Sequence, residues 1–208
     1  MALSWIDITG LIIIILTLVA IILNVKVLTA TYKKTKNIST LYFDFVFIFF
    51  IIAIITLLLE KVGFTIYDNN PNQLIAYFSE WNAIIALIFS GCSIITINLF
   101  AFHNTYPEKK KIIMPIIIIL AALYVFLLCY SIFSNMYMGG LWAQVLEGEI
   151  TYTAEVSLWS FIFLIPMVLP GPIVFFYFSY MTKESNPGNS KRSLWMGIAI
   201  TFFFIGYN

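Results

Sequence analysis

Apolar blocks of about 20 residues, divided by short polar stretches, are the feature that most constrains this chain. A bilayer core of about 30 Å requires about 20 apolar residues from each helix that crosses it. Six apolar segments can be drawn, at residues 8–28, 41–59, 83–102, 112–133, 158–180 and 194–207. The blocks predict an all-α fold, a single polytopic bundle of membrane helices over residues 1–208 with the sixth segment incomplete.

Composition excludes the soluble classes of protein. Hydrophobic residues make up 62% of the 208 residues and charged residues 10%, against roughly 45 to 50% and 25% in soluble domains. So little charge cannot cover a water-soluble fold. The net charge of +1 gives no electrostatic basis for binding nucleic acid, so the lipid bilayer is the expected partner.

Basic residues gather on alternate connections between the segments, the first, third and fifth. They are Lys26, Lys33, Lys34 and Lys36, then Lys109, Lys110 and Lys111, then Lys183, Lys191 and Arg192. On the opposite side the only basic residue is Lys61, and most of the acidic residues lie there. Basic loops remain in the cytoplasm. The sequence therefore predicts a multi-pass protein of the cell membrane with its N-terminus outside.

The two terminal segments call for separate interpretations. Asp7 precedes the first segment and lysines follow it, the reverse of a secretory signal, so this segment is expected to stay as a membrane helix. Residues 194–207 would reach only about 21 Å as a helix, short of the bilayer core. A fragment of a longer membrane protein is the favoured interpretation, because a chain-terminal carboxylate is costly to bury in lipid. A native partial helix is the alternative.

The sequence offers little for catalysis or metal binding. Cys92 and Cys129 lie at depths about 9 Å apart in their helices, which argues against a disulfide, and the lone His103 cannot form a multi-histidine metal site. No charged residue lies deep in a segment, since Asp44 and Glu60 are near segment edges. Ion-driven transport usually relies on such deep charges. We therefore expect no catalytic residue, cofactor or metal, and whether the whole protein is an enzyme stays open.

Segment five carries the strongest local signal, the prolines and glycine of Pro166 to Pro172. Each proline removes a backbone donor and clashes with the preceding turn. We expect a bend near Pro170 that forms a hinge or a cavity wall, with a static kink as the alternative. The third segment presents small residues at helical spacing, and segment five is predicted to pack against them. These residues are Ala83, Ala86, Ser90 and Ser93.

Four residues are candidates for binding a small molecule from the outer side: Asn98, Trp142, Glu147 and Pro170. The Asn98 amide lies in an apolar segment and should seek a partner helix or a cavity; Asn24 is a weaker case of the same kind. Trp142 and Glu147 belong to an aromatic and acidic loop, residues 135–157. We expect part of this loop to form a short helix on the membrane surface. It would act as a lid over a pocket or only as an interfacial belt.

The layout resembles the seven-helix sensory input region of prokaryotic histidine kinases. The likeness rests on the short basic loops, the stretch from Gly140 to Trp195 with Leu158-Trp159, and Lys191-Arg192 before the last segment. In that family a seventh helix leads to a cytoplasmic signalling domain, so the resemblance implies a receptor for signal transduction, acting on a downstream domain or partner helices. A transporter or channel subunit with a broken fifth helix is the alternative, and an accessory membrane subunit is the next.

Overall fold

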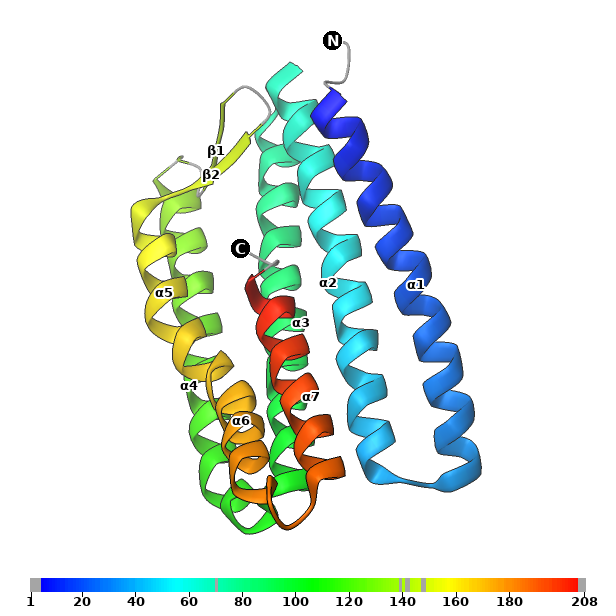
Figure 1. The fold of residues 1–208 in the computed structure, drawn as a ribbon. Coiled ribbons are helices and arrows are strands. Elements are labelled where there is room, and N and C mark those ends of the chain that lie inside the picture. Colours follow the sequence, from blue (N-terminus) through cyan, green and yellow to red (C-terminus); the bar gives the residue numbers. More distant parts are fainter. Residues whose placement is uncertain (1–4, 70, 139, 141–142, 147–148, 206–208) are drawn as a thin grey trace.

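The computed structural model describes residues 5–69, 71–138, 140, 143–146 and 149–205, and nearly all of them are helical (Figure 1). The elements are α1 (Trp5–Thr35), α2 (Ile38–Asn69), α3 (Gln73–Thr105), α4 (Pro107–Tyr137), β1 (Ala143–Leu146), β2 (Glu149–Tyr152), α5 (Ala154–Val168), α6 (Pro170–Thr182) and α7 (Pro187–Ile205). The predicted all-α bundle is confirmed, with one small hairpin of strands added to it.

Five helical stretches in the described part of the chain are long and apolar enough to cross a membrane. They are Ile12–Thr35, Ile38–Tyr67, Gln73–Thr105, Pro107–Met136 and Leu158–Thr182, the last of which joins α5 to α6. With 32 residues, α2 is about 48 Å long, which exceeds a bilayer core of about 30 Å. Helix ends must therefore project into the headgroup regions. The chain is a multi-pass membrane protein.

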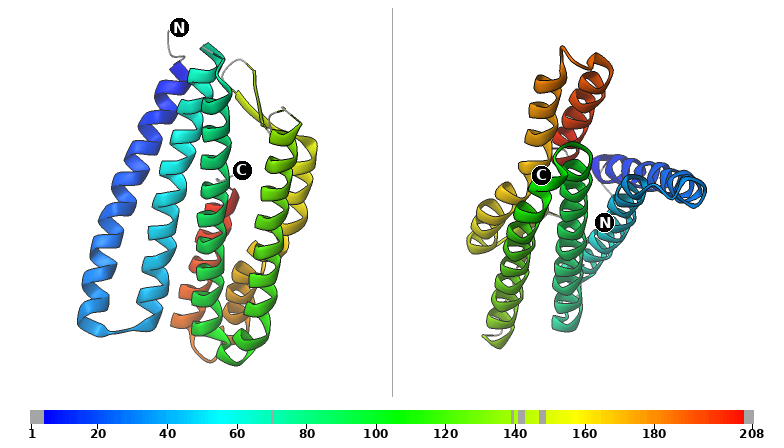
Figure 2. Two further views of the ribbon diagram at one scale, coloured as in Figure 1. Left: turned by 180° about the vertical axis from the view of Figure 1, so that it is seen from behind. Right: turned by 90° about the horizontal axis from the view of Figure 1, so that it is seen from below.

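Helix α3 occupies the centre of the bundle. It packs against α2 on one side and against α4 and α6 on the other, while α1 packs on α2 (Figure 2). In the most apolar 18-residue stretch of each helix, half of the residues of α3 are buried, compared with 6% of those of α1. Small side chains on α3, such as Ala83 and Ala86, are fully buried and allow neighbouring helices to approach closely.

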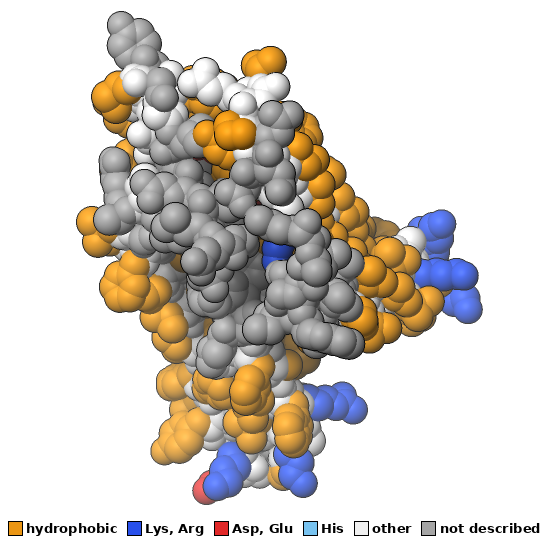
Figure 3. Space-filling model, turned by 90° about the horizontal axis from the view of Figure 1, so that it is seen from above, with side chains coloured by type: hydrophobic (Ala, Val, Ile, Leu, Met, Phe, Trp, Pro, Cys, Tyr) orange, Lys and Arg blue, Asp and Glu red, His pale blue; other side chains and the backbone are white. Residues whose placement is uncertain are grey.

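The two ends of the bundle differ in character. The strands lie at one end, together with the start of α1 and the connection from α2 to α3 (Figure 1); we call this the hairpin end. The connections from α1 to α2, α3 to α4 and α6 to α7 lie at the other end, the lysine-rich end. Seen from the hairpin end, apolar side chains cover much of the visible flanks (Figure 3), which suits a surface in contact with lipid.

The loop before α5 forms a β-hairpin, so the prediction of a short interfacial helix there is wrong. Val145 of β1 pairs with Ile150 of β2, and Ala143 pairs with Tyr152, in antiparallel register. Valine, isoleucine, threonine and tyrosine favour strands, and the two strands are only two residues apart in sequence, a spacing typical of hairpins. Strand pairing satisfies backbone groups that a helix of only a few residues would leave unpaired at its ends.

Candidate functional site

The membrane segment built from α5 and α6 is broken at Leu169 (Figure 1). Pro170 and Pro172 have no N–H group, so two helical hydrogen bonds across the break cannot form. Leu169 itself still bonds on both sides, to the Ile165 oxygen and from the Ile173 nitrogen, each at 3.1 Å. The predicted bend near Pro170 is confirmed, and the chain remains continuous through a single residue between the two helices.

Asn98 of α3 meets this break directly. Its Nδ2 atom donates to the main-chain oxygen of Met167 at 2.8 Å and to that of Ile94 at 2.9 Å. The side chain is fully buried (0% exposed), and its Oδ1 atom has no hydrogen-bond partner among the described residues. A Cβ atom on Gly171 would come within 3.4 Å of Oδ1. Glycine at this position therefore lets the start of α6 approach the amide closely.

One member of the row of small residues on α3, Ser93, contacts a different helix from the one predicted, whereas Ala83 belongs to a cluster against which Phe163 and Leu164 of segment five pack. Ser93 Oγ donates to the Val46 oxygen of α2 at 3.2 Å, so Ser93 faces α2 and the predicted contact with segment five is wrong at this position. Ser93 and Asn98 are five residues apart, which places them about 140° apart around a helix. One face of α3 receives α2, and another face receives the break.

The structure describes two of the four candidate residues, and both lie at the break. Asn98 bonds to the last turn of α5 and Pro170 is the first residue of α6, whereas Trp142 and Glu147 lie outside the described residues. The strands β1 and β2 lie at the hairpin end of α5. That helix has 15 residues and is about 22 Å long. A pocket shared by the strands and the break would have to extend over that length.

Three carboxylates are packed inside the bundle, a feature that the sequence did not reveal. Glu60 of α2 and Glu80 of α3 are 1% and 0% exposed, and Asp44 of α2 is also buried. Thr29 of α1 donates from Oγ1 to Asp44 Oδ2 at 2.7 Å. Glu60 and Glu80 each lie about 10 Å inside the hairpin end of their apolar spans. In the sequence, Glu60 and Glu80 lie at nearly equal distances from the α2–α3 connection, and this symmetry could have indicated that they lie at the same depth.

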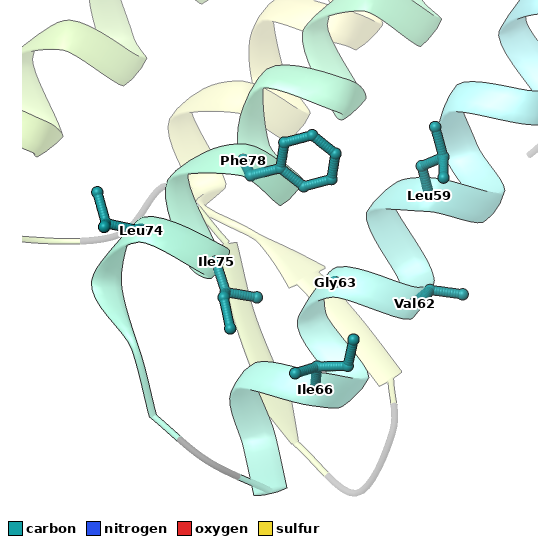
Figure 4. A pocket seen from close by; sticks show the side chains of 7 residues that line it. All are labelled: Leu59, Val62, Gly63, Ile66, Leu74, Ile75 and Phe78. Carbon is teal, nitrogen blue, oxygen red and sulfur yellow. The ribbon is translucent and has the colours of Figure 1, made fainter.

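An apolar groove lies on the outside of α2 and α3 near the hairpin end (Figure 4). Its volume is about 300 Å³, and its lining consists of Leu59, Val62, Gly63, Ile66, Leu74, Ile75 and Phe78. Leu74 is 77% exposed, so the groove opens toward the surroundings. It offers no polar side chain to a ligand, and lipid chains are a sufficient explanation for its apolar character.

Within the described residues, no group of three or more His, Cys, Asp or Glu side chains could hold a metal ion. His103 instead makes an edge-to-face contact with the ring of Tyr42, with 5.6 Å between the ring centroids. Cys92 and Cys129 are free thiols. No family model matches the sequence, and no curated protein or solved structure shows significant similarity to it.

Proposed function

We propose that this membrane bundle is a sensory input domain in which a stimulus changes the position of α6 and α7 relative to α3. The observation that carries the proposal is the break at Leu169, where the Asn98 amide bonds to the Met167 oxygen. A sensor requires an element with two arrangements of similar free energy. A helix that is interrupted by prolines, and joined to α3 by a side-chain bond next to the interruption, is such an element.

Helices α6 and α7 are joined tightly enough to move together. Ser179 Oγ donates to the Ser190 oxygen at 2.9 Å, and Ser190 Oγ donates to the Ser179 oxygen at 2.8 Å. Ser193 Oγ adds a bond to the Phe175 oxygen at 2.8 Å. All three serines are buried. These bonds favour rigid-body motion of the helix pair about Leu169 over separation of the two helices.

The free energy of one hydrogen bond between helices is of the size that a two-state switch requires. A hydrogen bond between membrane helices contributes about 0.6 kcal/mol on average and at most about 2 kcal/mol. Losing the bond from Asn98 would shift a two-state equilibrium by about threefold to thirtyfold. A small molecule that binds one arrangement better, or a physical change in the bilayer, could supply that difference.

The resemblance to the seven-helix input region of prokaryotic histidine kinases supports the same proposal. In this view the protein lies in the cell membrane with its N-terminus outside, detects an external signal and passes the change to a signalling domain or to partner helices. The alternation of basic and acidic connections supports the orientation.

Distance measurements between spin labels test the proposed motion. Labels at Trp195→Cys on α7 and Leu123→Cys on α4, both exposed side chains, would report the position of α7, with Cys92 and Cys129 replaced by serine. In lipid nanodiscs we expect two distance populations, whose ratio changes in Asn98→Ala. Asn82→Ala is the matched control, because the Asn82 amide bonds only within α3 among the hydrogen bonds described. One narrow distance, unaltered by Asn98→Ala, would contradict the proposal.

Transport is the second candidate, favoured specifically by the buried Glu60 and Glu80 in spanning helices. Carboxylates enclosed by membrane helices commonly mark proton or cation paths. Proteoliposomes containing a pH-sensitive dye would detect proton flux, and isotope uptake would detect sodium. Flux in the wild-type protein that is lost in Glu80→Gln, at equal protein levels, would replace the sensor proposal with transport.

A further inference from the structure

Helix α1 carries an asparagine on its outer surface, inside its apolar span. Asn24 lies within the apolar span Ile12–Thr35, and its short side chain is exposed. The exposed Lys26, two residues further on, has a longer side chain that can reach the headgroups. Thr17 and Thr31, also exposed, lie seven residues to either side. Most other exposed side chains along this helix are isoleucine, leucine and valine. The exposed surface of α1 thus has a stripe of small and polar side chains, formed by Thr17, Ala20, Asn24 and Thr31.

Both threonine hydroxyls donate to main-chain oxygens within α1, whereas the asparagine amide has further donor and acceptor positions. Thr17 donates to the Ile13 oxygen and Thr31 to the Val27 oxygen, both at 2.8 Å. Asn24 Nδ2 donates to the Ala20 oxygen at 2.9 Å, which is one of about four bonds an amide can form. Hydrocarbon provides no partner for the others, so exposure at this depth is costly. Asn98, in contrast, is buried and bonded to another helix.

We propose that α1 pairs with α1 of a second copy of this chain along the stripe Thr17, Ala20, Asn24 and Thr31. Two copies inserted in the same orientation bring Asn24 to the same depth without any further requirement. An amide both donates and accepts, so two Asn24 side chains related by a twofold axis can bond to each other. A different protein would need its own polar group at the depth of Asn24.

The spacing and size of the stripe fit such a pair. A repeat of seven residues keeps a stripe on the contact line of two helices that cross at about 20°. Alanine and threonine allow close approach of the backbones. The stripe lies beside the α2 contact, because Ile21 of the same helix is buried. A second α1 can therefore dock without displacing α2.

Cysteine cross-linking of the full chain in its native membrane tests the proposal. Thr17→Cys, Asn24→Cys and Thr31→Cys are placed singly in a background with Cys92 and Cys129 replaced by serine. The matched set is Leu16→Cys, Leu23→Cys and Ala30→Cys, which has the same spacing on another exposed face of α1. Mild oxidation should yield disulfide-linked dimers from the stripe set and little from the matched set. Equal yields from the two sets would overturn the proposal.

Association in nanodiscs or liposomes provides a measurement that does not depend on cysteine chemistry. Energy transfer between labelled copies should show the dimer dissociation constant rising about tenfold in Asn24→Leu, with Asn24→Gln restoring much of the association and Leu23→Val leaving it unchanged. A protein that is monomeric at every lipid dilution, or an Asn24→Leu variant that associates as well as the wild type, would refute pairing at this stripe. Cross-links formed only with another protein would show that the partner is not a second copy.

Discussion

The side-chain amide of Asn98 donates to the main-chain oxygen of Met167 at 2.8 Å, and this bond joins the broken membrane segment to the central helix. The prolines at positions 170 and 172 remove backbone donors at the same place. An amide from α3 thus supplies a donor where the α5–α6 segment lacks them. Gly171 completes the arrangement, because a Cβ atom at this position would already lie 3.4 Å from side-chain atoms of Asn98 and Ile97.

Replacing Asn98 by alanine is expected to lower the free energy of unfolding by about 1 to 2 kcal/mol, because the bond is lost and a buried oxygen keeps no side-chain donor. Unfolding of the detergent-solubilised protein in SDS, followed by tryptophan fluorescence, measures the change. Asn82→Ala removes a buried amide of the same helix that bonds to the Phe78 oxygen, and it should cost less. Equal losses in the two variants would show that the contact with Met167 contributes nothing beyond local helix bonding.

The contact between Gly63 and Ser79 determines how closely α2 and α3 approach. A Cβ atom on Gly63 would overlap the Ser79 side chain, whose own Cβ would lie 3.2 Å away. Gly63→Ala should therefore push the helices apart and lower the thermal stability by several degrees. Gly91→Ala is the matched control, because nothing lies within 4 Å of the added methyl group; it should be neutral or stabilising through helix propensity.

A second substitution separates this clash from other effects of Gly63→Ala. If the Ser79 side chain is the obstacle, Ser79→Gly should restore much of the stability when combined with Gly63→Ala, although Ser79→Gly alone is destabilising. The coupling between two contacting sites is expected to exceed about 0.5 kcal/mol. Strictly additive losses in the double variant would rule out the direct contact as the cause.

The paired serines of α6 and α7 make a prediction about local opening. Ser179→Ala combined with Ser190→Ala removes both reciprocal bonds, so the two helices should separate more often near the exposed Lys183 between them. Trypsin cleavage at Lys183 in detergent should accelerate several-fold. Thr201→Val, which removes a hydroxyl bonded only within α7 among the bonds described, should leave the cleavage rate unchanged. A rate unaffected by the serine substitutions would mean that apolar packing alone holds the pair.

Features that depend on local chemistry could be predicted from the sequence. The positions of the apolar spans follow from bilayer thickness, and the break near Pro170 follows from the missing N–H groups of proline. The prediction that the Asn98 amide needs a partner helix or a cavity follows from the cost of an unpaired amide in hydrocarbon. Each of these statements needs only one segment and its surroundings, not the identity of its neighbour.

Features that depend on which helices meet could not be predicted. Membrane helices are apolar on all sides, so hydrophobic periodicity does not distinguish a buried face from one in lipid. The sequence therefore led to the wrong neighbour for Ser93, which faces α2, and it did not indicate that Glu60 and Glu80 are enclosed. The hairpin of β1 and β2 was missed because residues such as Leu141, Val145 and Leu146 match a short helical face as well as a strand.

The charge distribution makes a final prediction, that the lysine-rich end faces the cytoplasm and the hairpin end faces outward. Loops with lysine and arginine resist translocation, whereas acidic residues matter little. Glu184→Cys tests the lysine-rich end without removing a positive charge, and Gln73→Cys tests the hairpin end; both native side chains are exposed. In cells expressing a background with Cys92 and Cys129 replaced by serine, a membrane-impermeant maleimide should label Gln73→Cys, and Glu184→Cys only after the membrane is permeabilised.

The reverse pattern would place the N-terminus inside and remove the proposed external stimulus. Labelling of both sites in intact cells would instead indicate mixed insertion, which the strong asymmetry of lysines argues against.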